Sequence, residues 1–262
     1  PKALKYGADI VCVDIEDAIA PSQKNSARET TLALFDQDID IATPECIVRI
    51  NNLRSVDGLR DVIAILEQTR PPPALMLTKV KSRDEVCQLD ELLSMPPHDV
   101  IRFHVIIETN EGLEAAHEIA RSSKRIDSLL FGGVDMSAEL RTNLEWENLL
   151  YARSRVVHAA AGAGIDLLDV PSLDLDDLKS LERSARASAD LGFTGKAAIH
   201  PRQVPIINAC FSPSTEAIAE AQKIVKAFES SEDGLVVVDG KLLERPVLRS
   251  MYRILAIAEQ NR

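Results

Sequence analysis

The chain has 262 residues, of which 45% are hydrophobic and 27% are charged. This balance is typical of a globular protein with a sizeable core, and it excludes collagen, intrinsic disorder and a coiled-coil rod. The 30 Lys and Arg residues are outnumbered by 41 Asp and Glu residues, a formal net charge of −11, so we expect no binding to nucleic acid or membranes.

Short β-rich segments alternate with longer helical patterns along most of the chain. Several short segments are almost continuously apolar, such as I-V-C-V at 10–13 and S-L-L-F at 128–131. Such runs are typical of strands buried on both faces of a parallel sheet, and the alternation predicts βαβ units. The seven predicted strands are Asp9–Ile15, Cys46–Asn51, Ala74–Val80, Val100–Glu108, Ser128–Gly132, Asp166–Val170 and Lys196–His200.

Seven strands are one fewer than a TIM-type (β/α)8 barrel contains. The chain opens in K-A-L-K-Y-G, which is typical of a helix end with Gly7 as its stop. We therefore predict an α/β fold, a TIM-type (β/α)8 barrel whose first strand precedes Pro1. A doubly wound open sheet is the alternative, but it normally has a glycine-rich fingerprint after its first strand, and D-I-E-D-A-I-A-P has no glycine.

The pattern changes after His200. Ser214–Phe228 has the apolar stripe of an amphipathic helix, a hairpin-like stretch with a turn at Asp239-Gly240 follows, and a last helix ends the chain. We assign residues 1–210 to the barrel and residues 211–262 to a C-terminal segment. This segment needs a surface to cover, either the mouth of its own barrel or a neighbouring subunit, so we expect a lid or a swapped element.

The four cysteines form no C-x-x-C pair and no zinc knuckle. Cys12 and Cys46 fall inside apolar strands, which predicts buried free thiols in a reducing compartment. No apolar run approaches the roughly 18 residues of a membrane span, and no signal-peptide pattern is present. We therefore expect a cytoplasmic protein.

In a parallel barrel, functional groups lie at the C-terminal ends of the strands. Glu108 follows the apolar run V-I-I, and Asp135 follows F-G-G-V. Neighbouring strands lie about 4.8 Å apart, so the two carboxylates could share one hard cation. Water and substrate oxygens would fill the other positions, as is usual for Mg²⁺. In the alternative, Glu108 caps the next helix or pairs with Arg49 or Lys79.

Arg49 lies in I-V-R-I-N-N, a strand otherwise suited to burial. A buried guanidinium needs a carboxylate, either from a ligand or, in a purely structural role, from Glu16 or Asp17. Gly132 and Gly133 remove side chains beside the predicted metal, so a ligand could approach the backbone there. Their structural alternative is a plain turn after the strand.

Five ordered motifs resemble a known family over about Ala8 to Phe228. They are V-D-I-E-D-A-I-A-P, R-I-N, I-I-E-T-N-E-G, F-G-G-V-D-M and G-F-T-G-K-A-A-I-H-P-R-Q. Together they resemble the CitE-like group of the HpcH/HpaI aldolase/citrate lyase superfamily, which includes citrate lyase β subunits, malyl-CoA lyases and citramalyl-CoA lyases. The resemblance implies a TIM-type barrel, Mg²⁺ as the cofactor, and a homotrimer or a hexamer formed as a dimer of trimers.

The resemblance also implies residue roles. The metal ligands of the family match Glu108 and Asp135, and its substrate-binding arginine matches Arg49. In several members a tail carboxylate of the neighbouring subunit does acid–base work within D-G-x-M-I-D-x-P; here D-G-K-L-L-E-R-P has Glu244, one methylene longer, in that place. The acidic D-x-E-D motif matches three residues that we place near the metal's water molecules, namely Asp14, Glu16 and Asp17.

The family reaction is the reversible carbon–carbon cleavage of a 3-hydroxyacyl thioester to an acyl thioester and a 2-oxo acid. We therefore predict a Mg²⁺-dependent lyase for a citramalyl- or malyl-CoA type of substrate, in which Arg49 stabilises the enolate oxygen and Glu244 moves protons. The alternatives are a citrate-lyase-like β subunit, a metal-dependent aldolase using free pyruvate, and a non-catalytic metabolite-binding barrel. By charge alone, the candidates for holding the CoA phosphates are Lys24, Arg28, Lys81 and Arg83.

Overall fold

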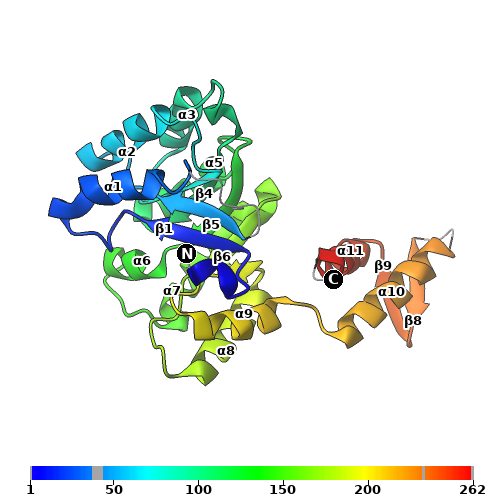
Figure 1. Cartoon of the computed structure of the whole chain (residues 1–262). Helices are drawn as coiled ribbons and strands as arrows, with labels where there is room; N and C mark the ends of the chain where they lie inside the picture. The colour runs from blue at the N-terminus through cyan, green and yellow to red at the C-terminus, as the bar shows by residue number, and fades with distance from the viewer. Residues whose placement is uncertain (1, 37–43, 232–233, 261–262) are drawn as a thin grey trace.

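A computed structural model describes residues 2–36, 44–231 and 234–260. In this part of the chain, seven parallel strands form one curled sheet in which each strand lies beside the next along the sequence (Figure 1). The first strand expected before Pro1 lies outside the described residues. The strands are β1 (Ile10–Asp14), β2 (Glu45–Arg49), β3 (Ala74–Leu77), β4 (Arg102–Ile107), β5 (Ile126–Phe131), β6 (Asp166–Asp169) and β7 (Gly195–Lys196).

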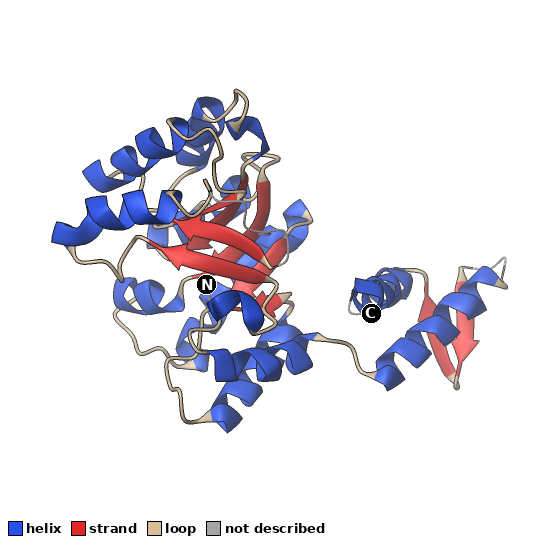
Figure 2. Ribbon diagram, in the orientation of Figure 1, coloured by secondary structure: helices blue, strands red, loops and turns tan. Residues whose placement is uncertain are grey.

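Helices connect the strands and surround the curled sheet (Figure 2). Ser82 and Glu85 form a capping box, in which they bond reciprocally at the start of α3. The helices are α1 (Lys24–Leu32), α2 (Val56–Leu66), α3 (Arg83–Leu92), α4 (Asn110–Glu114), α5 (Ala116–Ile119), α6 (Gly133–Glu139), α7 (Trp146–Ala163), α8 (Leu178–Leu191) and α9 (Val204–Phe211). The described residues also include four 3-10 turns: η1 (Lys2–Lys5), η2 (Pro21–Gln23), η3 (His98–Val100) and η4 (Pro201–Gln203).

The predicted α/β class and parallel sheet are confirmed, but most strands end earlier than expected, the last one most of all. The segment Lys196–His200 forms a strand only at its start, and the N–H of Ala197 still bonds to the carbonyl of Asp169. The chain then turns, because the His200 side chain accepts a hydrogen bond from the N–H of Arg202 at 3.1 Å and caps η4. The end of the motif G-F-T-G-K-A-A-I-H-P-R-Q therefore starts the 3-10 turn η4.

The interior of the molecule contains one large apolar core between the sheet and its helices. A buried charge cluster lies beside this core: Asp169 bonds to Lys196 at 2.6 Å and to Arg153 at 3.0 Å. The two cations share this one carboxylate, which also accepts a hydrogen bond from the hydroxyl of Ser188 at 2.7 Å. The lysine of G-F-T-G-K thus fastens β7 to β6, which is a structural role.

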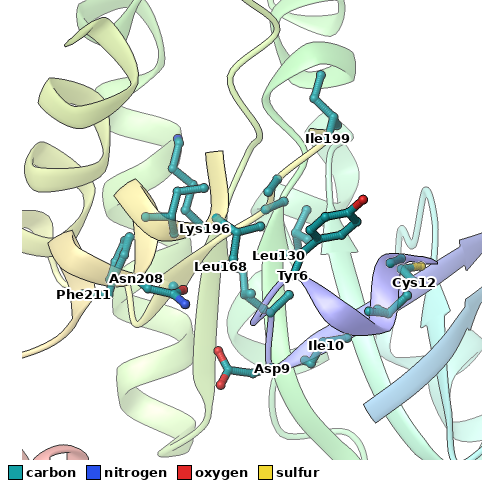
Figure 3. A pocket seen from close by; sticks show the side chains of 18 of the residues that line it. Tyr6, Asp9, Ile10, Cys12, Leu130, Leu168, Lys196, Ile199, Asn208 and Phe211 are labelled. Atoms are coloured by element: carbon teal, nitrogen blue, oxygen red, sulfur yellow. The ribbon is translucent and has the colours of Figure 1, made fainter. Parts of the chain in front are cut away.

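Cys46 is buried as predicted, but Cys12 is exposed, so the prediction of a buried Cys12 was wrong. Cys12 lines a cavity of about 440 Å³ whose walls include residues of β1 and β7, the two edges of the sheet (Figure 3). The sequence pattern shows a strand, but not that the inner face of this strand borders a cavity. Desolvation by the surrounding protein still raises the pKa of the Cys12 thiol to about 12.

After α9, residues 212–214 lead to a C-terminal unit that stands apart from the sheet in Figure 1. It consists of α10 (Thr215–Glu229), the hairpin β8 (Leu235–Val238) and β9 (Lys241–Glu244), and α11 (Pro246–Gln260). The predicted turn is confirmed, since Asp239 and Gly240 both have the positive φ that a two-residue hairpin turn requires. Its own small core contains Ile224, Phe228, Val236 and Val238. None of the described helices is both long and apolar enough to cross a membrane.

Candidate active site

The order of the sheet brings the predicted polar residues to one rim. Because β1 to β5 are neighbours in sequence order and all parallel, their carboxyl ends lie side by side. This is why residues spread over more than 100 positions of sequence can form one site. The rim carries Asp14 from β1, Arg49 from β2, Lys79 after β3, Glu108 after β4 and Gly132 after β5.

Arg49 is held mainly by Asp14. The parallel register places the two residues opposite one another on β1 and β2. Arg49 donates from Nε to Oδ1 at 2.8 Å and from Nη2 to Oδ2 at 2.5 Å, while its Nη1 lies 3.6 Å from Oε2 of Glu16. Burial would raise the pKa of Asp14, but the hydrogen bonds from Arg49 and the backbone hold it below its ordinary value. The predicted structural partner Glu16 is thus the second contact, and Asp14 is the first.

Lys79 forms ion pairs with the other two carboxylates of the D-x-E-D motif. Its ammonium lies 2.5 Å from Oε1 of Glu16 and 2.8 Å from Oδ2 of Asp17. Glu16 lies between two cations, Arg49 and Lys79, and little solvent reaches it, since it is only 4% exposed. All three carboxylates of the motif therefore have a cationic partner.

Glu108 is different, because it is buried without an ion-pair partner among the described residues. Its Oε1 accepts the backbone N–H of Lys79 at 2.8 Å. Glu108 does not cap α4, whose cap is the side chain of Thr109. On its other side lies Gly132, where a Cβ would stand 2.5 Å from Cβ and 2.6 Å from Oε2 of Glu108. Glycine is therefore required beside this carboxylate.

Asp135 supplies the second carboxylate without an ion pair in the described part of the chain. It is half-buried in the first turn of α6, slightly beyond the strand end where the sequence placed it. Burial, and next the charge of Asp135, raise the pKa of Glu108 to about 7. The structure thus brings the two predicted metal ligands close enough for their charges to interact.

These two carboxylates fit a Mg²⁺ ion. Their oxygens are hard ligands, and no cationic side chain of the described residues forms an ion pair with Glu108 or Asp135, although the charge of Lys79 is felt by both. No group of three or more His, Cys, Asp or Glu residues in the described ranges could hold a metal. A cation at this place would therefore have two protein ligands, with water and substrate oxygens completing its shell, which is common for Mg²⁺.

Two predicted site residues lie elsewhere. A side chain on Gly133 would meet Phe131 and Val170 at 3.1 Å, so this glycine faces the core whereas Gly132 faces Glu108. Glu244 ends β9 in the C-terminal unit and is exposed, and Figure 1 shows that unit apart from the rim of the same chain. A single chain does not bring Glu244 to the site.

The four basic residues singled out by charge separate into two pairs. The choice of Arg28 as a candidate for holding a CoA phosphate was wrong, because this side chain is buried and forms an ion pair with Asp61 at 2.5 Å. Lys24 is also occupied, since its ammonium donates to the carbonyls of residues 15 and 16 and to a side-chain amide. Lys81 and Arg83 remain at the surface, Lys81 with Glu111 as its partner.

Sequence reasoning missed the group that fastens the rim loops together. Asp61, fully buried on α2, accepts the backbone N–H of Asn51 at 2.8 Å and its side-chain amide at 2.7 Å. Asn51 in turn donates to the carbonyl of Ile15 at 3.0 Å, which holds the loop after β1 against the end of β2. The available signal was an Asp on the apolar face of an amphipathic helix, next to Val62 and in line with Ile65.

Comparison with known proteins finds relatives over nearly the whole chain. A model of the HpcH/HpaI aldolase/citrate lyase family matches residues 1–201. The citrate lyase subunit beta of Leuconostoc mesenteroides subsp. cremoris is 29% identical over 98% of this chain and 87% of that protein. The mitochondrial citramalyl-CoA lyase of Rattus norvegicus is 30% identical over 95% of this chain and 79% of that protein.

A solved structure is similar at the same level. The protein CitE from Mycobacterium tuberculosis, in complex with magnesium, acetoacetate and coenzyme A, has a TM-score of 0.80 and 30% identity. The match covers 98% of this chain and 92% of that one.

Proposed function

The chain belongs to the HpcH/HpaI aldolase/citrate lyase family, and we propose that it is a Mg²⁺-dependent carbon–carbon lyase. Its reaction is the reversible cleavage of a short 3-hydroxyacyl-CoA, of the citramalyl-CoA or malyl-CoA type, to an acyl-CoA and a 2-oxo acid. The proposal is supported by relatives that are lyases, and by a similar structure that contains magnesium and coenzyme A.

One observation about charge carries the assignment of the site. Among the carboxylates described above, Asp14, Glu16 and Asp17 each form an ion pair with Arg49 or Lys79. The other two, Glu108 and Asp135, lie within electrostatic reach of each other and have no ion-pair partner among the described residues. A pair of uncompensated carboxylates is costly to bury, and a bound cation removes that cost.

Glu108 and Asp135 would hold the ion. When bound, Mg²⁺ supplies a Lewis acid that stabilises negative charge on the oxygens of the 2-oxo acid. Glu108 must give up its proton first, since burial keeps its pKa at about 7. Gly132 places no side chain of its own against this carboxylate.

Arg49 is suited to the thioester side of the reaction. Cleavage leaves an enolate whose oxygen needs a fixed donor. The two bonds to Asp14 fix the plane of the guanidinium, and they leave Nη1, 3.6 Å from Glu16, as the end best able to donate. A preorganised donor of this kind stabilises the developing charge without reorganising during the reaction.

The C-terminal unit presents Glu244 on an apolar face. Pairing of β8 with β9 puts Leu235 opposite Glu244 and Val237 opposite Leu242, so these four residues share one face of the hairpin. The opposite face packs on α10 and α11, whereas Val237 is 68% and Leu242 64% exposed. Such a face favours burial against another surface.

We propose that residues 211–262 cover the rim of a neighbouring subunit in a homo-oligomer, a trimer or a hexamer. Glu244 would then serve as the acid–base group of the neighbour's site, because its own chain holds it away from Glu108 (Figure 1). Gly133 would contribute to substrate binding only through its backbone.

The curled sheet is, in this proposal, the wall of a TIM-type barrel. β1 and β7 each have one neighbour in the sheet. An eighth strand between these two edges would close the cavity of Figure 3 and complete a (β/α)8 barrel.

A citrate-lyase-like β subunit is the second candidate, favoured by the relative that matches 98% of the chain. In that case the thioester is carried by an acyl carrier protein, and the net charge of −11 opposes binding of such acidic partners.

A direct assay separates the candidates. The purified protein is mixed with citramalyl-CoA, malyl-CoA or a citryl-carrier thioester, with Mg²⁺ or with EDTA, and the 2-oxo acid is followed as its phenylhydrazone. We expect Mg²⁺-dependent release from a CoA thioester and none from the Glu108→Gln variant. Release from the carrier thioester alone would favour the second candidate, and no release from any of the three would contradict a lyase.

A further inference from the structure

Lys79 has an unusual backbone for a lysine. It follows β3 with φ 52°, in the left-handed region that glycine adopts readily and other residues adopt at a cost. Outliers of this kind persist only where the surrounding structure imposes them, and they concentrate at functional sites. This one lies on the rim, between the strands that carry Arg49 and Glu108.

The conformation lets one residue reach two sides of the site. A positive φ turns the Cα–Cβ bond well away from the N–H bond about the N–Cα axis, whereas the common negative values keep the two on nearly the same side. The N–H of Lys79 points to Oε1 of Glu108 at 2.8 Å, toward β4. The side chain runs the other way, toward the loop after β1, where its ammonium bonds to Glu16 and Asp17.

The contact also leaves Glu108 little freedom. The backbone N–H of Lys79 holds Oε1, and Gly132 lies so close on the other side that a Cβ there would stand 2.6 Å from Oε2. A carboxylate that must bind a cation is oriented by such outer partners, whose loss typically weakens metal binding about 10–100-fold.

We propose that Lys79 is a positioning residue for the metal site: its left-handed backbone directs its N–H onto Glu108, while its ammonium is anchored on Glu16. The proposal deepens the proposed function, because it assumes that Glu108 is a metal ligand. It assigns to Lys79 a role that resides in its backbone and is separate from its charge.

A series of neutral variants isolates the backbone. Lys79→Gly and Lys79→Asn remove the ammonium but tolerate positive φ, whereas Lys79→Val removes the same charge and disfavours that conformation strongly. Because all three lack the charge, any difference among them reports the backbone. The readout is the affinity for Mn²⁺ alone, measured from the loss of the free-ion EPR signal, with competition by Mg²⁺.

We expect Lys79→Gly and Lys79→Asn to bind Mn²⁺ alike, and Lys79→Val to bind it about 10–100-fold more weakly. A merely structural role would lower the melting temperature of the valine variant but leave the Mn²⁺ affinity of its folded fraction unchanged, and that result would overturn the proposal. If Lys79→Val does not fold, Lys79→Ala replaces it in the comparison with Lys79→Gly.

The variant Glu108→Gln keeps the two hypotheses apart. If it binds Mn²⁺ as well as the wild type, the metal site itself is wrong, and with it both the proposed function and the role of Lys79. If it loses binding while valine and glycine at position 79 bind equally, only the role of Lys79 fails.

Discussion

The guanidinium of Arg49 meets the carboxylate of Asp14 through two hydrogen bonds across neighbouring strands, Nε to Oδ1 at 2.8 Å and Nη2 to Oδ2 at 2.5 Å. The strand register sets the pair opposite each other, so the sheet itself aligns the contact. A guanidinium held by two hydrogen bonds has a fixed plane, which a lysine ammonium cannot reproduce.

Arg49→Lys should therefore lower kcat/KM about 10²–10³-fold, the usual cost of losing one donor to a developing oxyanion, while Mg²⁺ affinity stays unchanged. Steady-state kinetics and calorimetry with Mg²⁺ measure the two effects. Arg54→Lys is the matched control, since Arg54 is exposed and forms its ion pair with Glu85 rather than with a carboxylate of the site. Equal kinetics for the two variants would contradict the role of Arg49.

Glu108→Gln should abolish Mg²⁺-dependent turnover and yet stabilise the metal-free protein at pH 8. The pKa of Glu108 is about 7 in the folded state against 4.5 for an ordinary glutamate. The folded state therefore binds more protons between these two values, and the free energy of unfolding falls as pH rises through this window, by roughly 2–3 kcal/mol for this group. Glutamine has no titrating proton, so the Glu108→Gln variant does not lose stability in this way.

Urea unfolding in EDTA at pH 5 and pH 8 measures the effect. The wild type should lose stability relative to Glu108→Gln between the two pH values, and the exposed control Glu118→Gln should follow the wild type. If the free energy of unfolding changes equally with pH in all three proteins, burial of the Glu108 carboxylate does not lower stability at high pH.

Mg²⁺ binding should depend on pH for the same reason. A proton competes with the cation for Glu108, so the affinity should drop about tenfold from pH 8 to pH 6, as the carboxylate with a pKa of about 7 becomes protonated. Titration calorimetry in buffers of different ionisation enthalpy would also detect the released proton. An affinity independent of pH over this range would exclude Glu108 as the titrating ligand.

Gly132→Ala should weaken Mg²⁺ binding at least tenfold without unfolding the protein. The added methyl group would stand 2.5 Å from Cβ of Glu108, so the carboxylate has to move. Gly195→Ala is a suitable control, because a Cβ there makes only ordinary contacts, beginning at 3.4 Å. Circular dichroism verifies the fold, and unchanged binding in Gly132→Ala would mean that Glu108 has more room than the geometry allows.

Glu244→Gln should slow the chemical step about 10²–10⁴-fold and leave Mg²⁺ affinity intact, whereas Glu220→Gln on the exposed face of α10 should do neither. Mixed oligomers of Glu244→Gln and Glu108→Gln chains then test which subunit supplies the carboxylate. If the tail acts on a neighbour, some mixed sites contain both native residues and activity returns. Mixtures that stay as inactive as their parents would place Glu244 on its own chain's site, or outside catalysis.

Local sequence patterns predict many of the strands and turns of this protein. Runs such as S-L-L-F and the turn at Asp239-Gly240 mark strands and a hairpin because burial and backbone preference act over a few residues. The strand ends with Glu108 and Arg49 follow from the same reading. His200 is the exception, since an apolar stretch that looks like a strand ends early when a side chain caps the next helix.

Which residues at the strand ends form pairs depends on distances across the sheet, and a local sequence pattern does not contain these distances. The register that joins Asp14 to Arg49, the left-handed turn that aims Lys79 at Glu108, and the burial of Arg28 against Asp61 arise when strands and helices far apart in sequence pack together. Which carboxylates form ion pairs and which are left for a metal ion is decided by that packing, because Coulomb interactions and desolvation depend on position in space rather than on order along the chain.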